Sequence, residues 1–540
     1  DLLLGQGELI VGVMSADEIA LGIGDRLFRM KGRGENLKNV LEDPGIKKIS
    51  HDLKRLRVTL AREGLVLDGL NFDTMVAAYL LNPSKPAYSL PDVAWDYLGR
   101  LPSKDMDSAA ATDLIRLLRP KLENELKEKE LLELFEDLEM PLVMVLAQME
   151  ERGIKLDLKV LTLLSQKIET RLIQLKKEVY RTSGSQFNIN SPKQLRQVLF
   201  EQLKLPVVKR SKTGPSTDEE VLKSLADRHP LPKLLLEYRQ LTKLKNTYVD
   251  TLPALIDEKT GRLHTSFNQT ATETGRLSSS NPNLQNIPIK TDIGKILRKA
   301  IVASDDKSYL LSCDYSQIEL RVLAHLSKDT NLIAAFRQNK DIHMDAACLI
   351  YGLEEDGVTE AMREVAKRVN FGIVYGLTSF GLSRDLGISL DDAQRFIDAY
   401  FARYPGVQAY IQEQISKAAE SGFVTTLLGR RRYIPEINNK NQGLRQFAQR
   451  QAVNTPIQGT ASDLIKLAMI EIHQQIRARK LDAKMVLQIH DELVFDVQEK
   501  ELAELKEIAK DRMENVLKLD VPIKVDIKKG RNWLEMEECR

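Results

Sequence analysis

The sequence predicts a mixed α/β (α+β) protein that is built from several domains. Its 540 residues exceed the roughly 250–300 residues at which a single hydrophobic core stops growing. Charged residues make up 29% and hydrophobic residues 43%, an ordinary balance for a globular chain. Strand-like and helix-like segments alternate first, helices dominate the middle, and strands return at the end, which favours more than one α/β unit.

The composition argues against several other classes. Basic and acidic residues nearly cancel, 79 against 77, so any nucleic-acid binding must come from local clustering. The three cysteines, Cys313, Cys348 and Cys539, are far apart. We therefore expect no disulfide framework or zinc site, and a reducing cytoplasmic location. No apolar run reaches about 18 residues. The first residue is Asp and no signal peptide follows, so we expect a truncated or processed piece of a longer protein.

The first part of the chain predicts a small α/β domain followed by long helices. Residues 1 to about 100 alternate short apolar strands ("ELIVGVMS", "EIALGIG") with helical stretches ("NLKNVLED", "TMVAAYLL"). Residues 113–180 are helical and rich in charge. A coiled coil is the alternative there, but Pro141 and Gly153 interrupt the pattern.

A clear helix start follows in "NINSPKQLRQVLF". Ser191 is the expected cap, Pro192 the first helical residue, and Gln194 the partner that closes a capping box. The next segment, "KRSKTGPSTDEE", predicts a polar, basic loop. Further on we expect strands, a turn-rich loop and a helix over 261–326, mostly helices over 327–450, and strands at about 485–497 and 521–527.

An acidic residue lies at a predicted strand-to-helix junction in "YLLSCDYSQIELRVLAHL". The apolar strand ends at Asp314, and helical spacing begins with Ile318, Val322 and Leu326. A helix-capping Asp is the common alternative to a functional role.

The segment "QIHDELVFDV" interrupts an apolar strand with His490, Asp491 and Glu492. Burying adjacent carboxylates costs several kcal/mol unless something neutralises them. We predict the tip of a hairpin in the same sheet as Asp314, so that Asp314 and Asp491 meet around divalent cations. Magnesium prefers one or two carboxylates plus substrate phosphates, and a two-metal site activates an attacking oxygen and holds the leaving one. A polar hairpin turn is the alternative.

The segment "REVAKRVNFGIVYG" predicts a helix with two opposite stripes. One stripe contains Arg363, Lys367, Phe371 and Tyr375, and the other contains Met362, Val365, Val369 and Ile373. Cations suit a triphosphate and aromatic rings suit a base or sugar. A solvated basic face that runs into a buried aromatic pair is the alternative.

Two further segments carry regularly placed polar side chains. The turn-rich loop "TGRLSSSNPNLQNIP" contains polar side chains that suit minor-groove acceptors or sugars, namely Arg276, Asn283, Gln285 and Asn286. A hydrogen-bonded surface loop is the alternative. In "RQAVNTPIQGTASD", the polar residues Arg450, Asn454 and Gln458 recur every four positions. Pro456 beside them predicts a kink.

Together these segments resemble the family A DNA polymerases, in the Klenow-type large-fragment form of bacterial DNA polymerase I. "DYSQIELR", "RxxxKxxxFxxxYG" and "HDE" are similar to the three polymerase motifs of the family, in the same order and with the same intervening loop. The resemblance covers nearly the whole chain and is strongest from 186 to 540.

The resemblance implies a right-hand architecture of palm, fingers and thumb, preceded by a ribonuclease-H-like 3′–5′ exonuclease-type α/β domain. The implied domains are a degenerate exonuclease-like domain (1–115), connecting helices and thumb (116–260), the first part of the palm (261–326), fingers (327–446) and the second part of the palm (447–540).

The resemblance also implies roles for single residues. Catalysis would rest on Asp314, Asp491, Lys367 and Glu492, of which Lys367 would protonate the leaving pyrophosphate. Asp314, Asp491 and the backbone carbonyl of Tyr315 would bind two Mg²⁺ ions, for which Mn²⁺ is expected to substitute. The incoming nucleotide would contact Arg363, Lys367, Phe371, Tyr375, His343, Glu319 and Gln317. Primer–template DNA would contact Arg276, Asn283, Gln285, Asn286, Arg450, Asn454, Gln458, His490, Arg239 and Lys243.

The implied activity is template-directed addition of dNMP to a primer 3′-OH with release of pyrophosphate. The implied partners are primer–template DNA and dNTPs, without a membrane, and the implied state is a monomer. A single-subunit RNA polymerase is one alternative, against which Glu319 and Phe371 argue. The other is a non-catalytic primer–template binding protein, which would not need both Asp314 and Asp491.

The amino-terminal domain departs from the exonuclease pattern, which needs four metal-binding acids and a tyrosine. Its first strand lacks Asp-x-Glu, Leu56 stands where the second motif has Asp, and the motif tyrosine is absent near Asp113. Without ligands the domain cannot hold its metals. We therefore predict an inactive structural remnant.

Overall fold

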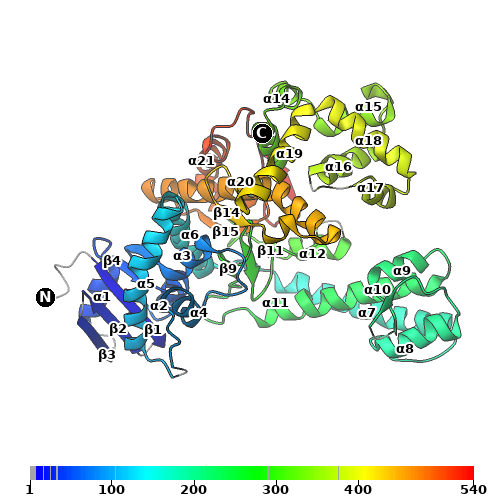
Figure 1. The fold of residues 1–540 in the computed structure, drawn as a ribbon. Helices are drawn as coiled ribbons and strands as arrows, with labels where there is room; N and C mark the ends of the chain where they lie inside the picture. Colours follow the sequence, from blue (N-terminus) through cyan, green and yellow to red (C-terminus); the bar gives the residue numbers. More distant parts are fainter. Residues whose placement is uncertain are drawn as a thin grey trace.

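The computed structural model describes residues 8–539 apart from 16–17, 25, 32–34, 104, 213, 289–290, 375 and 377. Figure 1 shows an α/β domain at the amino-terminal end, a central sheet with long helices around it, and two helical lobes that project from the centre. Of the helices described, none is long and apolar enough to cross a membrane.

The amino-terminal domain contains a five-stranded sheet in the order β3-β2-β1-β4-β5. Strands β1 to β3 are antiparallel, while β4 and β5 run parallel to β1. Helix α5 packs against β1 and β2. This confirms the predicted α/β domain, although α5 runs through its predicted end at 115. The strands are β1 Glu8–Ser15, β2 Glu18–Ile23, β3 Arg26–Lys31, β4 Lys47–Ser50 and β5 Leu70–Asp73, and the helices are α1 Glu35–Glu42, α2 Leu53–Arg62, α3 Thr74–Leu81, α4 Leu90–Leu98 and α5 Ser108–Glu128.

The thumb is a projecting pair of helices with a small tip. Helices α7 and α10 pack together, and the tip has a hydrophobic cluster of its own. The Ser191 hydroxyl accepts the Gln194 backbone N–H as predicted. The reciprocal half of the capping box is wrong, because the Gln194 side chain accepts the backbone N–H of Asn188 instead (2.6 Å). The elements are η1 Leu134–Glu139, α6 Met140–Arg152, α7 Leu158–Ser183, α8 Pro192–Arg196, η2 Gln197–Gln202, β7 Arg210–Ser211, β8 Gly214–Pro215, α9 Glu219–Leu225, α10 Pro230–Leu244, η3 Lys245–Val249 and α11 Thr251–Ala254.

The central palm is an antiparallel five-stranded sheet in the order β15-β16-β12-β17-β18. Strand β17 begins at Val525, so the strand predicted from 521 starts too early. Val521 and Ile523 are buried like strand residues, but Pro522 between them has no N–H for a ladder. The palm elements are β9 Ser266–Asn268, β10 Ser278–Ser280, α12 Asp292–Lys299, β12 Ser308–Tyr315, α13 Ile318–Ser327, α20 Gln442–Ala478, β15 Lys484–Ile489, β16 Glu492–Gln498, α21 Leu502–Asn515, β17 Val525–Gly530 and β18 Met536–Glu538, with a small pair formed by β6 Lys155–Leu156 and β11 Ile301–Val302.

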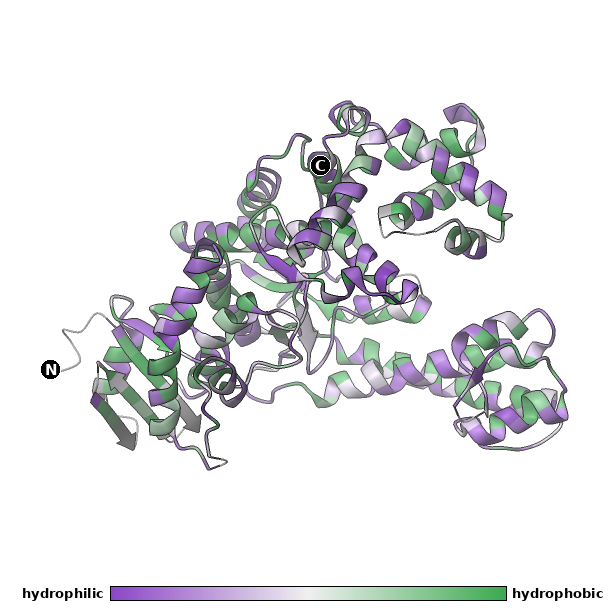
Figure 2. Ribbon diagram, viewed as in Figure 1, coloured by the Kyte–Doolittle hydropathy of each residue, from purple (hydrophilic) through white to green (hydrophobic). Residues whose placement is uncertain are grey.

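The fingers are the second projecting lobe, and they consist of helices (Figure 1). Figure 2 shows hydrophilic and hydrophobic segments side by side along these helices, which fits one face packing while another stays open. On α16, Val369 and Ile373 are buried as the stripe predicted. A two-stranded pair interrupts the helices expected over 327–450. The elements are α14 Thr330–Arg337, α15 Ile342–Tyr351, α16 Glu360–Val374, α17 Ser379–Leu386, α18 Leu390–Arg403, α19 Pro405–Ser421, β13 Phe423–Thr425 and β14 Arg431–Tyr433.

A buried charge network joins the segment after α5 to the palm helix α20. Arg430 forms ion pairs with Glu139 and with Asp463 (2.8 Å), and Lys466 donates to Glu139 (2.8 Å). All four side chains are buried. In addition, the Tyr79 hydroxyl in α3 donates to a palm backbone carbonyl (2.8 Å). Both contacts tie the amino-terminal part of the chain to the palm, because buried charges need their partners.

Candidate active site

Strand β12 places Asp314 in the middle of the palm sheet. Its cross-strand partner on β16 is Glu492, and its partner on β17 is Asp526. Directly opposed residues of antiparallel strands point to the same face, so three carboxylates form a row. Sequence reasoning missed Asp526. Asp526 lies beside Asp314 only because of the register in which β12 and β17 pair, and this register cannot be read from the sequence.

The hairpin tip predicted at "HDE" is confirmed. Ile489 pairs with Glu492, which leaves His490 and Asp491 as a two-residue turn. His490 adopts φ 53°, a left-handed conformation that is uncommon for residues other than glycine and concentrates at functional sites. The Tyr315 backbone N–H donates to the Asp491 carbonyl oxygen (3.1 Å). This bond fixes the turn to the end of β12 and thereby brings Asp491 to Asp314.

The two carboxylates are electrostatically unfavourable as they stand. Burial and the neighbouring carboxylates of Glu492, Asp491 and Asp526 raise the pKa of Asp314 to about 7. Burial raises the pKa of Asp491 to about 6, although Arg276 lowers it. Among the described residues, no side chain donates a hydrogen bond to either carboxylate or forms an ion pair with it.

This donor set fits a divalent cation that binds partly through substrate. In the described ranges no cluster of three or more His, Cys, Asp or Glu side chains is arranged to hold a metal by itself. Two unpaired carboxylates and a nearby carbonyl are the partial set that Mg²⁺ accepts when phosphates complete its shell.

Glu492 is held differently from the two aspartates. Its Oε1 accepts the Ser312 hydroxyl (2.6 Å) and the Trp533 indole N–H (2.9 Å). The Arg298 guanidinium lies over the Trp533 ring, 3.7 Å from its centroid. One Glu492 oxygen is thus engaged within the protein, while the catalytic role predicted for Glu492 stays a prediction. Ser312, Trp533 and Arg298 are partners that no sequence motif indicated.

The fingers helix α16 presents its predicted stripe to a cavity. Lys367 and Phe371 line a pocket with a water-accessible volume of about 730 Å³, and Arg450 of α20 lines it from the palm side. Arg363 is paired with Asp341 (2.7 Å), the cap of α15. Arg363 also approaches Glu360 (3.4 Å), so it is partly engaged within the protein, and its predicted contact with a triphosphate stays a prediction. The predicted contact Tyr375 lies outside the described residues.

His343 lies beneath α16 rather than in the cavity. Its side chain is 2% exposed, its Nδ1 is 3.0 Å from the Asn370 amide nitrogen, and its ring centroid is 5.7 Å from that of Phe371. Burial lowers the pKa of His343 to about 4, so the ring is neutral at pH 7. In this conformation His343 supports the helix, and its predicted contact with phosphate stays a prediction.

Glu319 lies at the start of α13 and is buried, with 6% exposure. Its carboxylate forms an ion pair with Arg276 from the turn-rich loop. The neighbouring Gln317 has φ 54° and precedes the helix without a side-chain cap bond. The structure thus couples the residue predicted to contact the sugar with the one predicted to contact the primer terminus.

Several residues predicted to contact DNA meet around one small cavity of about 20 Å³, space for about one water. Arg276, Gln285, His490 and Asp491 all line it. Gln488 links them, because it accepts from the Gln285 amide (3.1 Å) and donates to the His490 carbonyl (2.6 Å). Gln488 was not predicted from the sequence, although a polar residue within the apolar strand β15 could have indicated it.

The remaining predicted DNA contacts occupy two elements. In the turn-rich loop, the Asn283 side-chain oxygen accepts the backbone N–H groups of Gln285 and Asn286 (3.0 and 3.2 Å). On α20 the polar stripe is Arg450, Asn454 and Gln458, and α20 continues through Pro456 from Gln442 to Ala478. The Asn454 side-chain oxygen is buried without a hydrogen-bond partner.

Arg239 and Lys243 lie on the thumb helix α10, away from this cluster (Figure 1). Arg239 donates to the Thr217 carbonyl (2.5 Å) and Lys243 is exposed. The structure therefore does not bring them to the carboxylates, and their predicted contacts with the duplex backbone stay predictions.

The amino-terminal domain shows packing where the exonuclease motifs would lie. Leu56 is 6% exposed and belongs to the hydrophobic core. At Gly12 on β1, a Cβ atom would lie 2.1 Å from the Thr112 hydroxyl of α5, so the helix lies directly on the strand. Asp113 is paired with Arg116 (2.8 Å).

Comparison with known proteins agrees with this geometry. Residues 158–535 match DNA polymerase family A, and residues 29–102 match the ribonuclease H-like domain of DNA polymerase I. DNA polymerase I of Bacillus subtilis (strain 168) is 44% identical over 520 residues, which cover 93% of this chain and 59% of that protein. The thermostable DNA polymerase I of Thermus aquaticus is 43% identical over 531 residues, 97% of this chain and 62% of that protein.

A solved structure has the same fold. The POL domain of Pol1 from M. smegmatis, in complex with DNA primer-template and dNTP, is 37% identical with a TM-score of 0.93, covering 98% of this chain and 96% of that one. The chain spans about three fifths of the length of the two curated relatives. Its match to the family profile extends over most of its residues. The chain belongs to DNA polymerase family A.

Proposed function

We propose that the protein is a template-directed DNA polymerase that adds dNMP to a primer 3′-OH and releases pyrophosphate. The observation that carries the proposal is the pair Asp314 and Asp491. Two separate chain segments bring these carboxylates together, and within the described residues neither carboxylate has an ion pair, so both keep a raised pKa despite Arg276 and Lys528. Family membership and the DNA and dNTP bound to the similar Pol1 structure support the same activity.

The residues divide the reaction between palm and fingers. Asp314, Asp491 and the Tyr315 carbonyl would hold two Mg²⁺ ions, for which Mn²⁺ would substitute. When bound, the ions lower the pKa of the primer hydroxyl and neutralise charge on the phosphates. Arg363 and Lys367 would hold the triphosphate, and Lys367 would donate a proton to the leaving pyrophosphate.

Nucleotide selection and DNA positioning involve the remaining predicted residues. Phe371 would pack on the sugar, and Tyr375 would lie near the nascent pair. Glu319 would limit the space at C2′, Gln317 would contact the nucleotide, and His343 would contact its phosphate. Minor-groove and template contacts would come from Arg276, Asn283, Gln285, Asn286, Arg450, Asn454, Gln458 and His490, and duplex-backbone contacts from Arg239 and Lys243.

We also propose that the amino-terminal domain has no 3′–5′ exonuclease activity. The buried Leu56 cannot ligate a cation, and the first strand lacks Asp-x-Glu and packs closely against Thr112 of α5 at Gly12. A 3′-labelled single strand incubated with Mg²⁺ should release no mononucleotides. Release that disappears when acids before residue 120 are replaced would overturn this part of the proposal.

Primer extension with dNTPs and Mg²⁺ tests the polymerase directly. Asp314→Ala and Asp491→Ala should each lose nearly all incorporation, yet still retard primer–template on a gel, because phosphate contacts supply most DNA affinity. Incorporation of rNTPs without a primer would favour an RNA polymerase, and DNA binding without any extension would favour a non-catalytic protein.

A further inference from the structure

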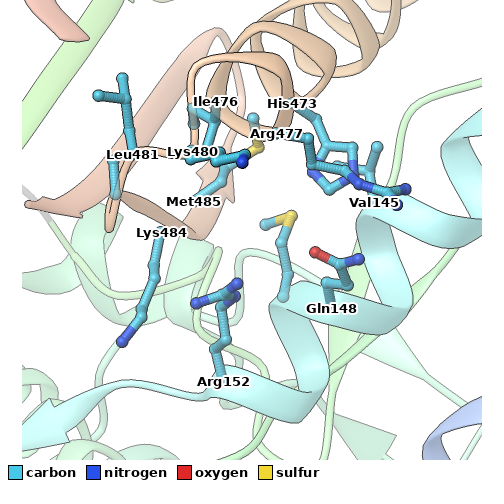
Figure 3. Close-up of a pocket in the computed structure, with 12 residues that line it drawn as sticks. Val145, Gln148, Arg152, His473, Ile476, Arg477, Lys480, Leu481, Lys484 and Met485 are labelled. Carbon is cyan, nitrogen blue, oxygen red and sulfur yellow. The ribbon is translucent and has the colours of Figure 1, made fainter. Parts of the chain in front are cut away.

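A third cavity lies on the palm, at the end of β15 opposite the His490–Asp491 turn. Its water-accessible volume is about 190 Å³, and α6, the end of α20 and the start of β15 enclose it (Figure 3). Pockets for drug-sized ligands measure about 300–1,000 Å³. The cavity therefore suits a smaller ligand than a nucleotide.

The polar groups around this cavity are mostly cationic. Arg152, Arg477, Lys480 and Lys484 line it, and no Asp or Glu does. Of these, only Lys484 has an ion pair within the described part of the chain, a 3.4 Å contact with Asp482. Figure 3 shows the arginine and lysine side chains arriving from both sides of the cavity.

A neighbouring arginine shows that unpaired cations are not the rule here. Arg479 lies two residues beyond Arg477, outside the cavity, and is paired with Glu504 (3.1 Å). Among the described residues, Arg152, Arg477 and Lys480 thus form no ion pair, although Asp482 and Glu151 act on Arg152 at longer range and Arg477 and Lys480 are exposed to solvent.

His473 on α20 adds an unsatisfied group to the same cavity. Its Nε2 is buried and has no hydrogen-bond partner, and the Gln148 side chain of α6 lies nearby in Figure 3. Buried polar atoms normally find a partner. In the tautomer that carries hydrogen on Nε2, this nitrogen can donate to a ligand, and the neighbouring cations favour a ligand with negative charge.

Helix ends account for only part of this charge. Arg152 ends α6, and Arg477 and Lys480 lie at the end of α20, where helix dipoles favour cations. Each helix end contributes about half a negative charge. Two ends and Asp482 offset roughly two of the four cations, so a charge of about +2 remains.

We propose that this cavity binds a small phosphate anion, either inorganic phosphate or pyrophosphate. Arg152, Arg477 and Lys480 would pair with its oxygens, and His473 and Gln148 would complete the hydrogen bonds. Contacts of about tenfold each would place Kd in the millimolar range, because Arg477 and Lys480 are exposed and solvent screens their charge. The proposal stands apart from the polymerase reaction and uses none of its residues.

Nuclear magnetic resonance of ¹⁵N-histidine-labelled protein tests the proposal, because the chain has only 7 histidines. Phosphate and pyrophosphate are titrated in separate experiments with EDTA and without DNA. The His473 signal, assigned with His473→Gln, reports on the cavity, whereas His343 reports on the fingers. The variants are Arg152→Gln/Arg477→Gln and, as the matched control, Arg479→Gln.

We expect a saturable shift of the His473 signal in the wild type and in Arg479→Gln. The double variant should bind at least about a hundredfold more weakly and should extend primers normally. A His473 signal that stays fixed up to 10 mM of both anions would overturn the proposal, as would equal shifts in the double variant. A shift with pyrophosphate alone would assign the site to the two-phosphate anion.

Discussion

Asp491→Asn is expected to make the metal-free protein more stable at pH 8 while it abolishes synthesis. The pKa of Asp491 is about 6 in the folded protein and near 3.8 when unfolded. An acid with a raised pKa ionises less readily in the folded state. As pH rises from about 4 to above 6, the folded protein therefore loses stability relative to the unfolded chain. Asparagine has no such ionisation.

The magnitude follows from the size of the shift. A rise from 3.8 to about 6 corresponds to about 3 kcal/mol once both states are ionised. Because the side chain is partly exposed to solvent, screening reduces this to about 1–2 kcal/mol. The gap between variant and wild type at pH 5 should be about half of the gap at pH 8, since the folded carboxyl is still mostly protonated there.

Thermal unfolding in EDTA at pH 5 and pH 8 measures both gaps, with Asp306→Asn as the control for removing an exposed palm carboxylate. At pH 8 the Asp491→Asn midpoint should lie about 1–2 °C above that of the wild type. Added Mg²⁺ should stabilise the wild type more than the variant, because binding to the folded state adds stability. An equal or lower midpoint for the variant, or a gap that does not change with pH, would refute the reasoning.

Three further outcomes are expected. Phe371→Tyr should narrow the preference for dNTP over ddNTP by about ten- to a hundredfold, because its hydroxyl replaces a charge-assisted hydrogen bond; single-nucleotide kcat/KM values measure this, and unchanged values would contradict the placement of α16. Glu319→Ala should admit rNTPs more readily at some loss of rate, since overpacking against its side chain costs about 1–3 kcal/mol; the same assay with rNTPs shows it, and unchanged rNTP discrimination would argue against a steric role. Arg430→Met should destabilise the fold by about 3–5 kcal/mol, because Asp463 loses its cation and Glu139 keeps only Lys466; denaturant unfolding measures the loss, and a change below about 1 kcal/mol would show that the network contributes little.

The elements of the site could be predicted because each leaves a local pattern. Asp314 follows an apolar run and precedes helical spacing, and the strand around Asp491 is interrupted by acids. These patterns located β12, α13 and the hairpin tip correctly. The stripe on α16 was equally readable, since Val369 and Ile373 are buried as the period requires.

What the sequence did not show depends on contacts between distant segments. Asp526 joins Asp314 only through the register of β12 and β17, and Trp533 reaches Glu492 across 41 residues. The position of Arg363 on the polar stripe of α16 was predicted. Its ion pair with Asp341 was not, because it forms only where α15 packs on α16. The alternating apolar residues Val521 and Ile523 predicted a strand from 521. Pro522 between them has no backbone N–H for the ladder, and β17 begins only at Val525.

The buried network around Lys466 also restricts how such a chain can evolve. Whatever activity the amino-terminal domain has, the segment that carries Glu139 cannot be deleted freely. A shorter descendant that began at Leu158 would keep the buried Lys466, which is 0% exposed. It would lack Glu139, the carboxylate that now accepts a hydrogen bond from the Lys466 ammonium group. Removal of the connecting segment before Leu158 is therefore a different change from removal of the amino-terminal domain, because only the connecting segment supplies Glu139, and its loss requires compensating substitutions inside the palm.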